Sequence, residues 1–322
     1  MNDVKIGVVG VGRMGEYHVG VLSELSGVQV SGISDVNQDR VKEMAERYRV
    51  PCYTDYRELF HLVDAVVVAV PTHMHFEVAR DFLNAGIHVL LEKPCANNLQ
   101  EARELFDISI KKKLVLHIGH VERFNGAVQE LSKIVTQPIF IECKRTCPFT
   151  DRIKDDGVVL DLMIHDIDIV LNIVRSKVRR VAVVGTSVFS KKDDLVSAQI
   201  EFENGCIANI LASRASQNKE RTLSVTQKDS YVKLDYTDQE IYVHRQSTSE
   251  HQLSKGSLRY KQESLVERIF VHKENPLKLE HQHFIDCLKN GSPRHVGVTE
   301  ELYSLEIALQ ILEQYNNNRA SN

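Results

Sequence analysis

Four polar residues recur in an otherwise apolar stretch of the chain, LDLMIHDIDIVLNIVR, residues Leu160–Arg175. They are Asp161, His165, Asp168 and Asn172, at spacings of four, three and four residues. On a helix these side chains form one polar stripe, while the apolar residues on the other faces predict burial. A buried polar stripe needs partners or a wet cavity. We predict that Asp161 orients His165, raises its pKa and makes it a general base for a hydroxyl proton.

A buried network that links two domains is the alternative interpretation of the same stripe. We favour that structural role for Asp168 and Asn172, and the catalytic role for Asp161 and His165. Asp166 points elsewhere on the helix and is predicted to cap or pair locally. Asp161, His165 and Asp168 could also ligate zinc on one helix face, but no second cluster with ligand spacing completes such a site. We therefore predict no metal.

The segment that must position this chemistry opens the chain. The apolar run Lys5–Val9 predicts a buried strand, and GVGRMG follows it before a helical pattern. In such a turn Gly10 permits the tight bend, Gly12 lets the backbone approach a pyrophosphate, and Gly15 lets the helix pack on the strand. The helix N-terminus offers N–H groups and a positive dipole end to the phosphates. The predicted phosphate site comprises Gly10, Gly12, Arg13, Met14 and Gly15.

Asp35 indicates which dinucleotide binds. It ends the second apolar run, Val28–Ser34, twenty residues after Gly15. A carboxylate there accepts hydrogen bonds from the adenosine ribose hydroxyls and repels the 2′-phosphate of NADP. Arg40 could soften that repulsion, but residues 34–37 hold no arginine. NAD is the predicted cofactor.

A lysine follows the fourth predicted strand, Ile87–Leu91, in the tripeptide Glu92-Lys93-Pro94. Ligands of open α/β sheets bind beyond the carboxyl ends of the strands, so Lys93 is predicted to reach the nicotinamide end of the cofactor. Pro94 disfavours a helical conformation at Lys93. A surface turn with a solvated lysine is the alternative, and the position at the strand end favours the site.

The chain of 322 residues is long enough for two domains. Its first 120 residues alternate strands and helices, and Val-rich runs such as DAVVVAV indicate strands buried on both faces of a doubly wound parallel sheet. After Gly119 a series of strand-like runs indicates a mostly antiparallel sheet, with helices near its two ends. The sequence predicts an α/β domain over residues 1–120 and an α+β domain over residues 121–322, with a loop at Gln246–Gln262.

Composition excludes several classes of function. The net charge of −4 gives no basic footprint for nucleic acid. No apolar stretch is long enough to cross a membrane, and the N-terminus has no signal-peptide pattern. The six cysteines are scattered and are predicted to be reduced thiols. We expect a cytoplasmic protein that binds neither nucleic acid nor membranes.

Taken together, these residues resemble the Gfo/Idh/MocA oxidoreductase family over nearly the whole chain. The resemblance is carried by GVGRMG, by VPTHMHFEVARDFLNAGIHVLLEKP, by the Asp161-x-x-x-His165 helix and by the closing EHQHFIDCLKNGSP and VTEELYSLEIALQILE. It implies an N-terminal Rossmann domain and a C-terminal α+β domain whose large open sheet forms homodimers or homotetramers. It also implies that Lys93, Asp161 and His165 are the catalytic set.

The family's Pro-Asn-x-x-His loop stands here as Pro71-Thr72-His73-Met74-His75. Thr72 replaces the common Asn, and the resemblance still implies a position near the nicotinamide ribose. The resemblance thus extends the predicted cofactor site, beyond the glycine turn and Asp35, to Pro71, Thr72, His75, Glu92 and Lys93.

A narrower resemblance runs from Arg145 to Ile173. This stretch is similar to dehydrogenases that oxidise the 3-hydroxyl of UDP-N-acetylglucosamine to a ketone, which an aminotransferase then converts to an amine. Two arginines beside an active site suit a nucleotide-sugar pyrophosphate, so Arg145 and Arg152 are predicted substrate contacts. Surface salt bridges with Asp151, Asp155 or Asp156 are an equal alternative. The loop GHVERFN, which matches a family loop bordering the substrate, completes the predicted substrate site of Arg123, Asn125, Arg145, Arg152 and His165.

The predicted function is NAD-dependent oxidation of a sugar hydroxyl to a ketone, with the 3-hydroxyl of a UDP-N-acetylhexosamine as the favoured substrate. His165 would accept the hydroxyl proton, Asp161 would hold His165, and Lys93 would stabilise the charge on the same oxygen. One alternative is an NAD(P)-dependent dehydrogenase of a free polyol or sugar such as an inositol. A non-catalytic NAD-sensing regulator is a third, against which the retention of a proton acceptor argues.

Overall fold

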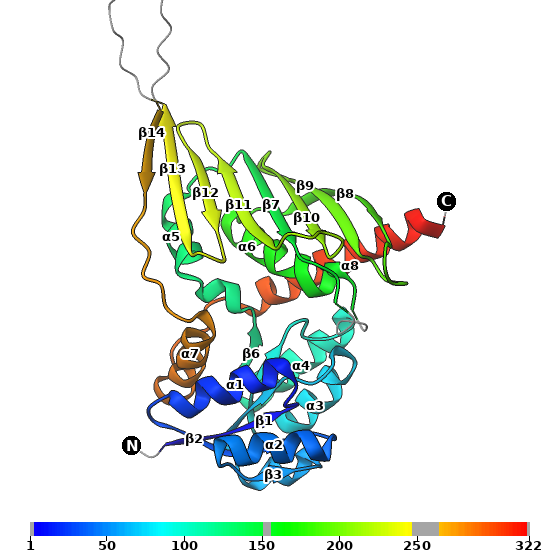
Figure 1. Cartoon of the computed structure of the whole chain (residues 1–322), viewed down its shortest axis with the longest axis vertical. Coiled ribbons are helices and arrows are strands. Elements are labelled where there is room, and N and C mark those ends of the chain that lie inside the picture. Colours follow the sequence, from blue (N-terminus) through cyan, green and yellow to red (C-terminus); the bar gives the residue numbers. More distant parts are fainter. Residues whose placement is uncertain (1–2, 151–155, 247–263, 321–322) are drawn as a thin grey trace, which may run out of the picture.

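The structure is a computed structural model that describes residues 3–150, 156–246 and 264–320. Two sheets, each with its own helices, follow one another along the long axis of the molecule (Figure 1). The N-terminal sheet has six parallel strands in the order β3-β2-β1-β4-β5-β6. They are β1 (Val4–Val9), β2 (Val28–Ser34), β3 (Cys52–Tyr53), β4 (Ala65–Val68), β5 (His88–Glu92) and β6 (Leu116–Gly119). The helices between them are α1 (Arg13–Glu24), α2 (Gln38–Tyr48), the short η1 (Tyr56–His61), α3 (Thr72–Asn84) and α4 (Leu99–Lys112).

Strand β4 shows why these strands are continuously apolar. Its four side chains are completely buried, and they alternate between two cores. Ala65 and Val67 belong to the core that includes residues of α1 and α2, whereas Val66 and Val68 belong to the core that includes residues of α3 and α4. Helices therefore cover both faces of the sheet, and the predicted doubly wound Rossmann sheet is confirmed.

The second sheet has eight strands in the order β14-β13-β12-β11-β7-β10-β9-β8. Its strands are β7 (Phe140–Thr146), β8 (Val178–Thr186), β9 (Leu195–Phe202), β10 (Ile207–Ser213), β11 (Glu220–Thr226), β12 (Tyr231–Asp235), β13 (Glu240–Gln246) and β14 (Ser264–Arg268). Strands β7 and β10 are parallel and the other pairs are antiparallel, which confirms the predicted mostly antiparallel sheet.

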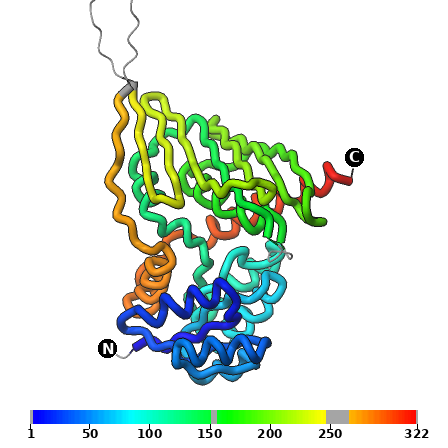
Figure 2. Tube along the Cα trace, viewed as in Figure 1, coloured from blue at the N-terminus to red at the C-terminus, as the bar shows by residue number. Residues whose placement is uncertain are grey.

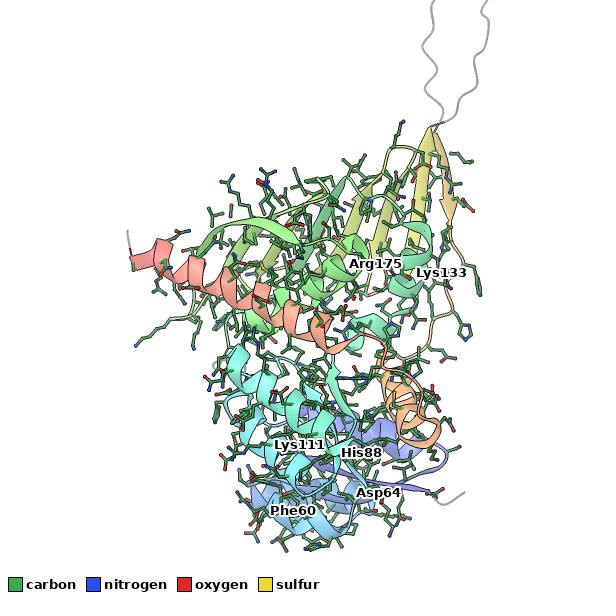
Figure 3. The ribbon with its side chains drawn as sticks, turned by 180° about the vertical axis from the view of Figure 1, so that it is seen from behind. Phe60, Asp64, His88, Lys111, Lys133 and Arg175 are labelled. Atoms are coloured by element: carbon green, nitrogen blue, oxygen red, sulfur yellow. The ribbon has the colours of Figure 1, made fainter. Side chains whose placement is uncertain are left out.

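Helices cover one face of this second sheet. They are α5 (Gly126–Ile134), α6 (Ile164–Val174) and α8 (Val298–Ala320), and Figure 3, seen from behind, shows α8 crossing the sheet. Side chains alternate accordingly: Val196, Ala198 and Ile200 of β9 are buried in the core with these helices. No helix among the described residues lies on the opposite face, so the sheet is open on that side.

The chain returns to the Rossmann domain after β14, as the trace in Figure 2 shows. Helix α7 (Pro276–Asn290) packs against α1 and against η2, a short 3-10 helix at Val121–Phe124. Phe284 and Ile285 of α7 join the core around α1 and α2, and Leu305 of α8 joins the core of α3 and α4. The second half of the chain therefore contributes to both cores, and a boundary at residue 120 stays a prediction.

The sequence missed two short strands, β3 and β14, and the two residues of β3 are too few to show alternation. The helix expected at Leu160–Arg175 begins instead with η3, a π-helical turn at Val159–Met163, before α6 starts. The loop expected at Gln246–Gln262 lies outside the described residues except for Gln246, which ends β13. All six cysteines are free thiols. In the described part of the chain, no helix has the length and apolar character needed to span a bilayer.

Candidate active site

Lys93 and Asp161 meet where the two domains face each other. Lys93 follows β5 of the Rossmann sheet, and Asp161 lies in the η3 turn. The Lys93 Nζ donates to the Asp161 carbonyl oxygen at 2.6 Å and forms an ion pair with Asp161 Oδ1 at 3.0 Å. Their side chains are 15% and 24% exposed, so both groups are partly accessible to solvent rather than buried in the core. An ammonium has three donors, and two of those of Lys93 are used here.

His165 lies in the first turn of α6, and its environment corrects a prediction. No hydrogen bond joins its imidazole to Asp161 or to any other described residue, and its Nδ1 is buried without a partner. Burial, reinforced by the positive charges of Lys93 and Arg145, holds the pKa of His165 well below its usual value. The prediction that Asp161 raises this pKa is wrong, because the carboxylate is paired with Lys93 and burial disfavours the imidazolium. A neutral imidazole is nevertheless the form that can accept a proton.

Glu92 supports Lys93 from inside the protein. It is buried, its Oε2 accepts from the backbone N–H of Lys93 at 3.2 Å, and its Oε1 lies 2.9 Å from His18 Nε2. His18 Nδ1 in turn lies 2.8 Å from Nε2 of His281 on α7. His18 and His281 were not predicted as part of the site, because 263 residues separate them and no local pattern connects them. Glu92 therefore fixes the turn that presents Lys93 from within, rather than facing a cofactor directly.

The glycine turn has the shape that a dinucleotide pyrophosphate needs. Gly10 has a φ of +84°, and a Cβ there would lie 2.6 Å from the Ala69 carbonyl oxygen. A Cβ on Gly15 would lie 1.8 Å from the Gly10 carbonyl oxygen, so the close helix–strand packing requires glycine. Around Gly12, by contrast, no heavy atom lies within 4 Å of such a Cβ, and no side chain caps the N-terminus of α1. This open, uncapped helix end fits the phosphates of NAD. Arg13 and Met14, both exposed, border it.

Asp35 lies beside this turn, at the end of β2. Its Oδ2 accepts from the backbone N–H of Val11 at 2.8 Å, and its Oδ1 accepts from that of Asn37 at 2.9 Å. Each carboxylate oxygen retains a second acceptor site for a ribose hydroxyl. Arg40 donates to the Val11 carbonyl oxygen at 3.0 Å and to Glu16 at 2.6 Å. The guanidinium of Arg40 is thus held by protein groups, and the prediction that the carboxylate of Asp35 binds a ribose stays open.

The residues predicted from the Pro-Asn-x-x-His loop are at the start of α3: Pro71 is its N-cap, Thr72 begins it, and His75 follows one turn later. Thr72 Oγ1 donates to Asp156 Oδ2 at 2.6 Å and thereby ties the two domains together. The ring nitrogens of His75 lie 2.7 Å from the Pro94 carbonyl oxygen and 2.9 Å from that of Val70. His75 therefore holds the Lys93 turn against the end of β4, and its contacts are with backbone.

Arg145 does not reach a substrate. It is 1% exposed, and its guanidinium forms two hydrogen bonds to Asp166, at 2.8 and 2.9 Å, and one to Glu122 at 2.9 Å. Its face stacks over the ring of Tyr236. We correct two expectations here: Arg145 is an internal structural group, and Asp166 pairs across to β7 rather than locally. Arg152, the other predicted phosphate contact, lies outside the described residues.

Arg123 and Asn125 are also internal. The guanidinium of Arg123 is bound by Asp168 at 2.6 and 2.7 Å and by Glu301 of α8, so η2, α6 and α8 are locked together. Despite burial, which alone would raise it, Arg123 lowers the pKa of Asp168 to about 2. Asn125 caps α5 and donates to the Tyr236 carbonyl oxygen at 2.9 Å. Both side chains are buried, and each of their polar atoms already has a protein partner, which corrects both expected substrate contacts.

Asp168 and Asn172 have the structural role that we favoured. Asp168 accepts from Arg123 and from Ser304 Oγ, and Asn172 donates to the Asp168 carbonyl oxygen at 2.8 Å. Asp161, His165 and Asp168 do not form the alternative zinc site, because the carboxylate of Asp161 binds Lys93 and that of Asp168 binds Arg123. Within the described residues, no group of three or more metal-ligating side chains converges.

Comparison with known proteins assigns the chain to a class. The sequence model of the Gfo/Idh/MocA oxidoreductase family, NAD-binding Rossmann fold, matches residues 4–120, and that of the GFO/IDH/MocA C-terminal domain matches residues 121–232. Together with the Rossmann turn and the open antiparallel sheet, these matches show that the chain belongs to the Gfo/Idh/MocA family of NAD-dependent oxidoreductases.

Three known proteins illustrate what this chain is similar to. UDP-N-acetylglucosamine 3-dehydrogenase from Acidithiobacillus ferrooxidans is 33% identical over 245 residues, 76% of this chain and 78% of that protein. Its solved structure superposes with a TM-score of 0.88 at 29% identity and covers 98% of both chains. Myo-inositol 2-dehydrogenase from Thermotoga maritima is 30% identical, over 66% of this chain and 69% of that protein. Scyllo-inositol dehydrogenase from Lactobacillus casei, solved with NAD(H) and scyllo-inositol, shares the fold at 16% identity and a TM-score of 0.78, covering 98% of each chain.

Proposed function

We propose that this protein uses NAD⁺ to oxidise the 3-hydroxyl of a UDP-N-acetylhexosamine, such as UDP-N-acetylglucosamine, to a ketone. The observation that carries the proposal is the similarity to the Acidithiobacillus enzyme, which extends over 98% of both chains in structure. The Lys93, Asp161 and His165 cluster supplies the groups that such a reaction needs.

Lys93 is the group that would stabilise the reacting oxygen. Its ammonium is held by two oxygens of Asp161, and its backbone by Glu92 and the turn that His75 supports. One ammonium donor remains to bond the hydroxyl oxygen of the sugar. A fixed positive charge at that point stabilises the negative charge that grows on the oxygen during oxidation. Asp161 is therefore proposed as the partner of Lys93.

His165 is the proposed proton acceptor. NAD⁺, when bound, accepts the hydride that leaves the sugar carbon. The imidazole is neutral, makes no hydrogen bond within the described protein, and lies near the positive charge of Lys93. It can therefore take the hydroxyl proton without first losing one. Because the imidazolium is disfavoured by burial, the proton should pass on to solvent.

A free polyol is the second candidate substrate. The similarity to the Thermotoga myo-inositol 2-dehydrogenase favours it, and the same acid–base groups would serve an inositol hydroxyl. The two candidates differ in charge, since UDP carries a diphosphate and an inositol carries none. UDP should therefore protect the protein against heat only if the substrate is a nucleotide sugar.

We also propose two partners. The open face of the eight-stranded sheet would pair with that of a second copy, giving a homodimer or homotetramer. A ketone at C3 of an aminosugar is a substrate for transamination, so an aminotransferase would consume the product. Light scattering on the purified protein tests the first proposal: a monomer at micromolar concentration would contradict it.

The reaction itself is tested by trapping. Protein, NAD⁺ and UDP-N-acetylglucosamine are incubated with hydroxylamine, and mass spectrometry searches for the oxime of the keto-sugar. Trapping is needed because sugar oxidation by NAD⁺ can stop far from completion. Lys93→Met and His165→Ala should each retain NAD⁺ binding but lower product formation on the order of 100-fold or more.

The controls separate the two candidate substrates. A panel of inositols and hexoses is run beside the nucleotide sugar, with UDP as the ligand in parallel thermal shifts. Oxime from the nucleotide sugar, absent in Lys93→Met, supports the proposal. Turnover of an inositol alone, with no stabilisation by UDP, would contradict the proposal and support oxidation of a free polyol.

A further inference from the structure

Two arginines stand side by side on the sheet beneath the candidate active site. Arg221 of β11 pairs directly with Arg145 of β7 in the antiparallel register. Directly paired residues project from the same face of a sheet. Arg145 meets Asp166 of α6, the residue after His165, so this is the face on which the catalytic helix lies. Like charges placed directly opposite are destabilising unless something offsets them.

The two guanidinium groups are neutralised to different extents. The guanidinium of Arg145 donates two hydrogen bonds to Asp166 and one to Glu122, so two carboxylates neutralise it. The Arg221 side chain is 37% exposed, and its one carboxylate contact within the described chain is Glu122, with NH1 at 3.7 Å from Oε1. That distance is too long for a hydrogen bond, and the same oxygen already accepts from Arg145. Arg221 thus brings a positive charge without a bidentate partner.

The charge of Arg221 acts on His165 and on a nearby thiol. Arg221 is among the positive charges that, after burial, lower the pKa of His165. It also opposes the effects of burial and of Asp161, which raise the pKa of the Cys147 thiol at the end of β7. Burial and the charge of Arg145 lower the pKa of Arg221 itself. Arg221 is thus a partly exposed cation that acts on both His165 and Cys147, on the sheet face that carries the candidate active site.

We propose that Arg221 binds the diphosphate of the nucleotide-sugar substrate. The inference rests on the proposed function, because a neutral polyol would leave this charge without a counterpart. A guanidinium presents a planar fork that matches two phosphate oxygens. The diphosphate would offset the repulsion between Arg221 and Arg145. Arg221 thereby takes the role that the sequence suggested for Arg145, whose guanidinium is already bound by Asp166 and Glu122.

Arg221→Gln tests the inference. The KM for UDP-N-acetylglucosamine should rise on the order of 10- to 100-fold, because a charge-assisted bidentate contact is lost. The inhibition constant of UDP should rise by a similar factor, while the KM for NAD⁺ stays unchanged. Arg180→Gln is the matched control: Arg180 also lies on a strand, β8, and contacts one carboxylate, Glu201, at 3.7 Å. It should leave all three constants as in the parent protein.

Arg221→Lys keeps the charge without the fork and should give a KM between those of the parent and Arg221→Gln. If Arg221→Gln misfolds and loses NAD⁺ binding, the KM of Arg221→Lys tests the inference instead. Parent protein that oxidises the nucleotide sugar, with KM unchanged in a folded Arg221 variant, would overturn the role of Arg221 alone. Parent protein that oxidises only a neutral polyol and ignores UDP would overturn the proposed function, and this inference with it.

Discussion

Lys93 and Asp161 are 68 residues apart in the chain, yet Lys93 Nζ lies 3.0 Å from Asp161 Oδ1. The pair joins the carboxyl end of a Rossmann strand to the π-helical turn that precedes α6. π-helical turns often occur at functional sites. Because the carboxylate of Asp161 binds the lysine and makes no hydrogen bond to the histidine, we propose that the acid–base work is divided: Asp161 would hold Lys93, and His165 would accept the proton as a neutral base.

That division predicts strong coupling between Lys93 and Asp161. Asp161→Asn should lower kcat about 10-fold or more, because Lys93 loses its ionic partner. Adding Asp161→Asn to Lys93→Met should cost little further activity, since residues that act as a unit are not additive. Steady-state rates of the two single variants and the double variant measure the coupling. Independent, multiplicative losses would show that Asp161 acts on something other than Lys93.

The lowered pKa of His165 predicts the acidic limb of the pH–rate profile. The base form persists until the pH falls through this lowered pKa, so kcat/KM should hold its plateau through pH 6.5 and decline only below it. Removing a positive charge favours the imidazolium, so Lys93→Met should raise the pKa of His165 toward its usual value.

Histidine-labelled NMR titration of the parent and of Lys93→Met measures that shift directly. His88, labelled in Figure 3, is a suitable internal control: burial also lowers its pKa, but the charge acting on it is that of Asp64. Its titration should be the same in both proteins. A plateau that ends near pH 6.5, or an unmoved His165, would contradict the assignment.

Glycines 12 and 15 should respond oppositely to alanine. Gly12→Ala meets no heavy atom within 4 Å and should leave the melting temperature nearly unchanged, while raising the KM for NAD⁺ because the methyl group occupies the pyrophosphate approach. Gly15→Ala would place a carbon 1.8 Å from the Gly10 carbonyl oxygen and should destabilise the fold. Thermal melts with and without NAD⁺ separate these effects. Normal NAD⁺ affinity in Gly12→Ala would exclude a close backbone–phosphate approach.

Arg123→Met distinguishes a structural arginine from a substrate contact. Removing it leaves Asp168 and Glu301 buried without their counter-charge, at a cost of about 3–5 kcal/mol of unfolding free energy. Denaturant unfolding measures that loss. At low temperature, the fraction of Arg123→Met that remains folded should keep the parent KM for the sugar substrate. A raised KM with unchanged stability would restore Arg123 to the substrate site.

The sequence by itself determined the elements and the chemistry that each one carries. Apolar periodicity gave the parallel and antiparallel sheets, and the spacing of Gly10, Gly12, Gly15 and Asp35 predicted the NAD site. Those patterns are local: a glycine in a tight turn, or an acid at a strand end, follows from backbone sterics and from the repeat of one element. Lys93 and His165 could be singled out because each lies at a special position of a single strand or helix.

Only the tertiary structure decided which charged groups meet. Arg145 is satisfied by Asp166, 21 residues away, and Arg123 by Glu301, 178 residues away, so neither remains for a substrate. The carboxylate of Asp161 binds Lys93 and not its neighbour His165. The fold brings a full ammonium charge to within 3.0 Å of this carboxylate, whereas burial favours the neutral imidazole. No motif marked Arg221. Its charge lacks a bidentate partner because the sheet register places it beside Arg145, which already binds Glu122. An arginine's role depends on the carboxylates that packing brings to it, and packing is set by contacts between elements far apart in the chain.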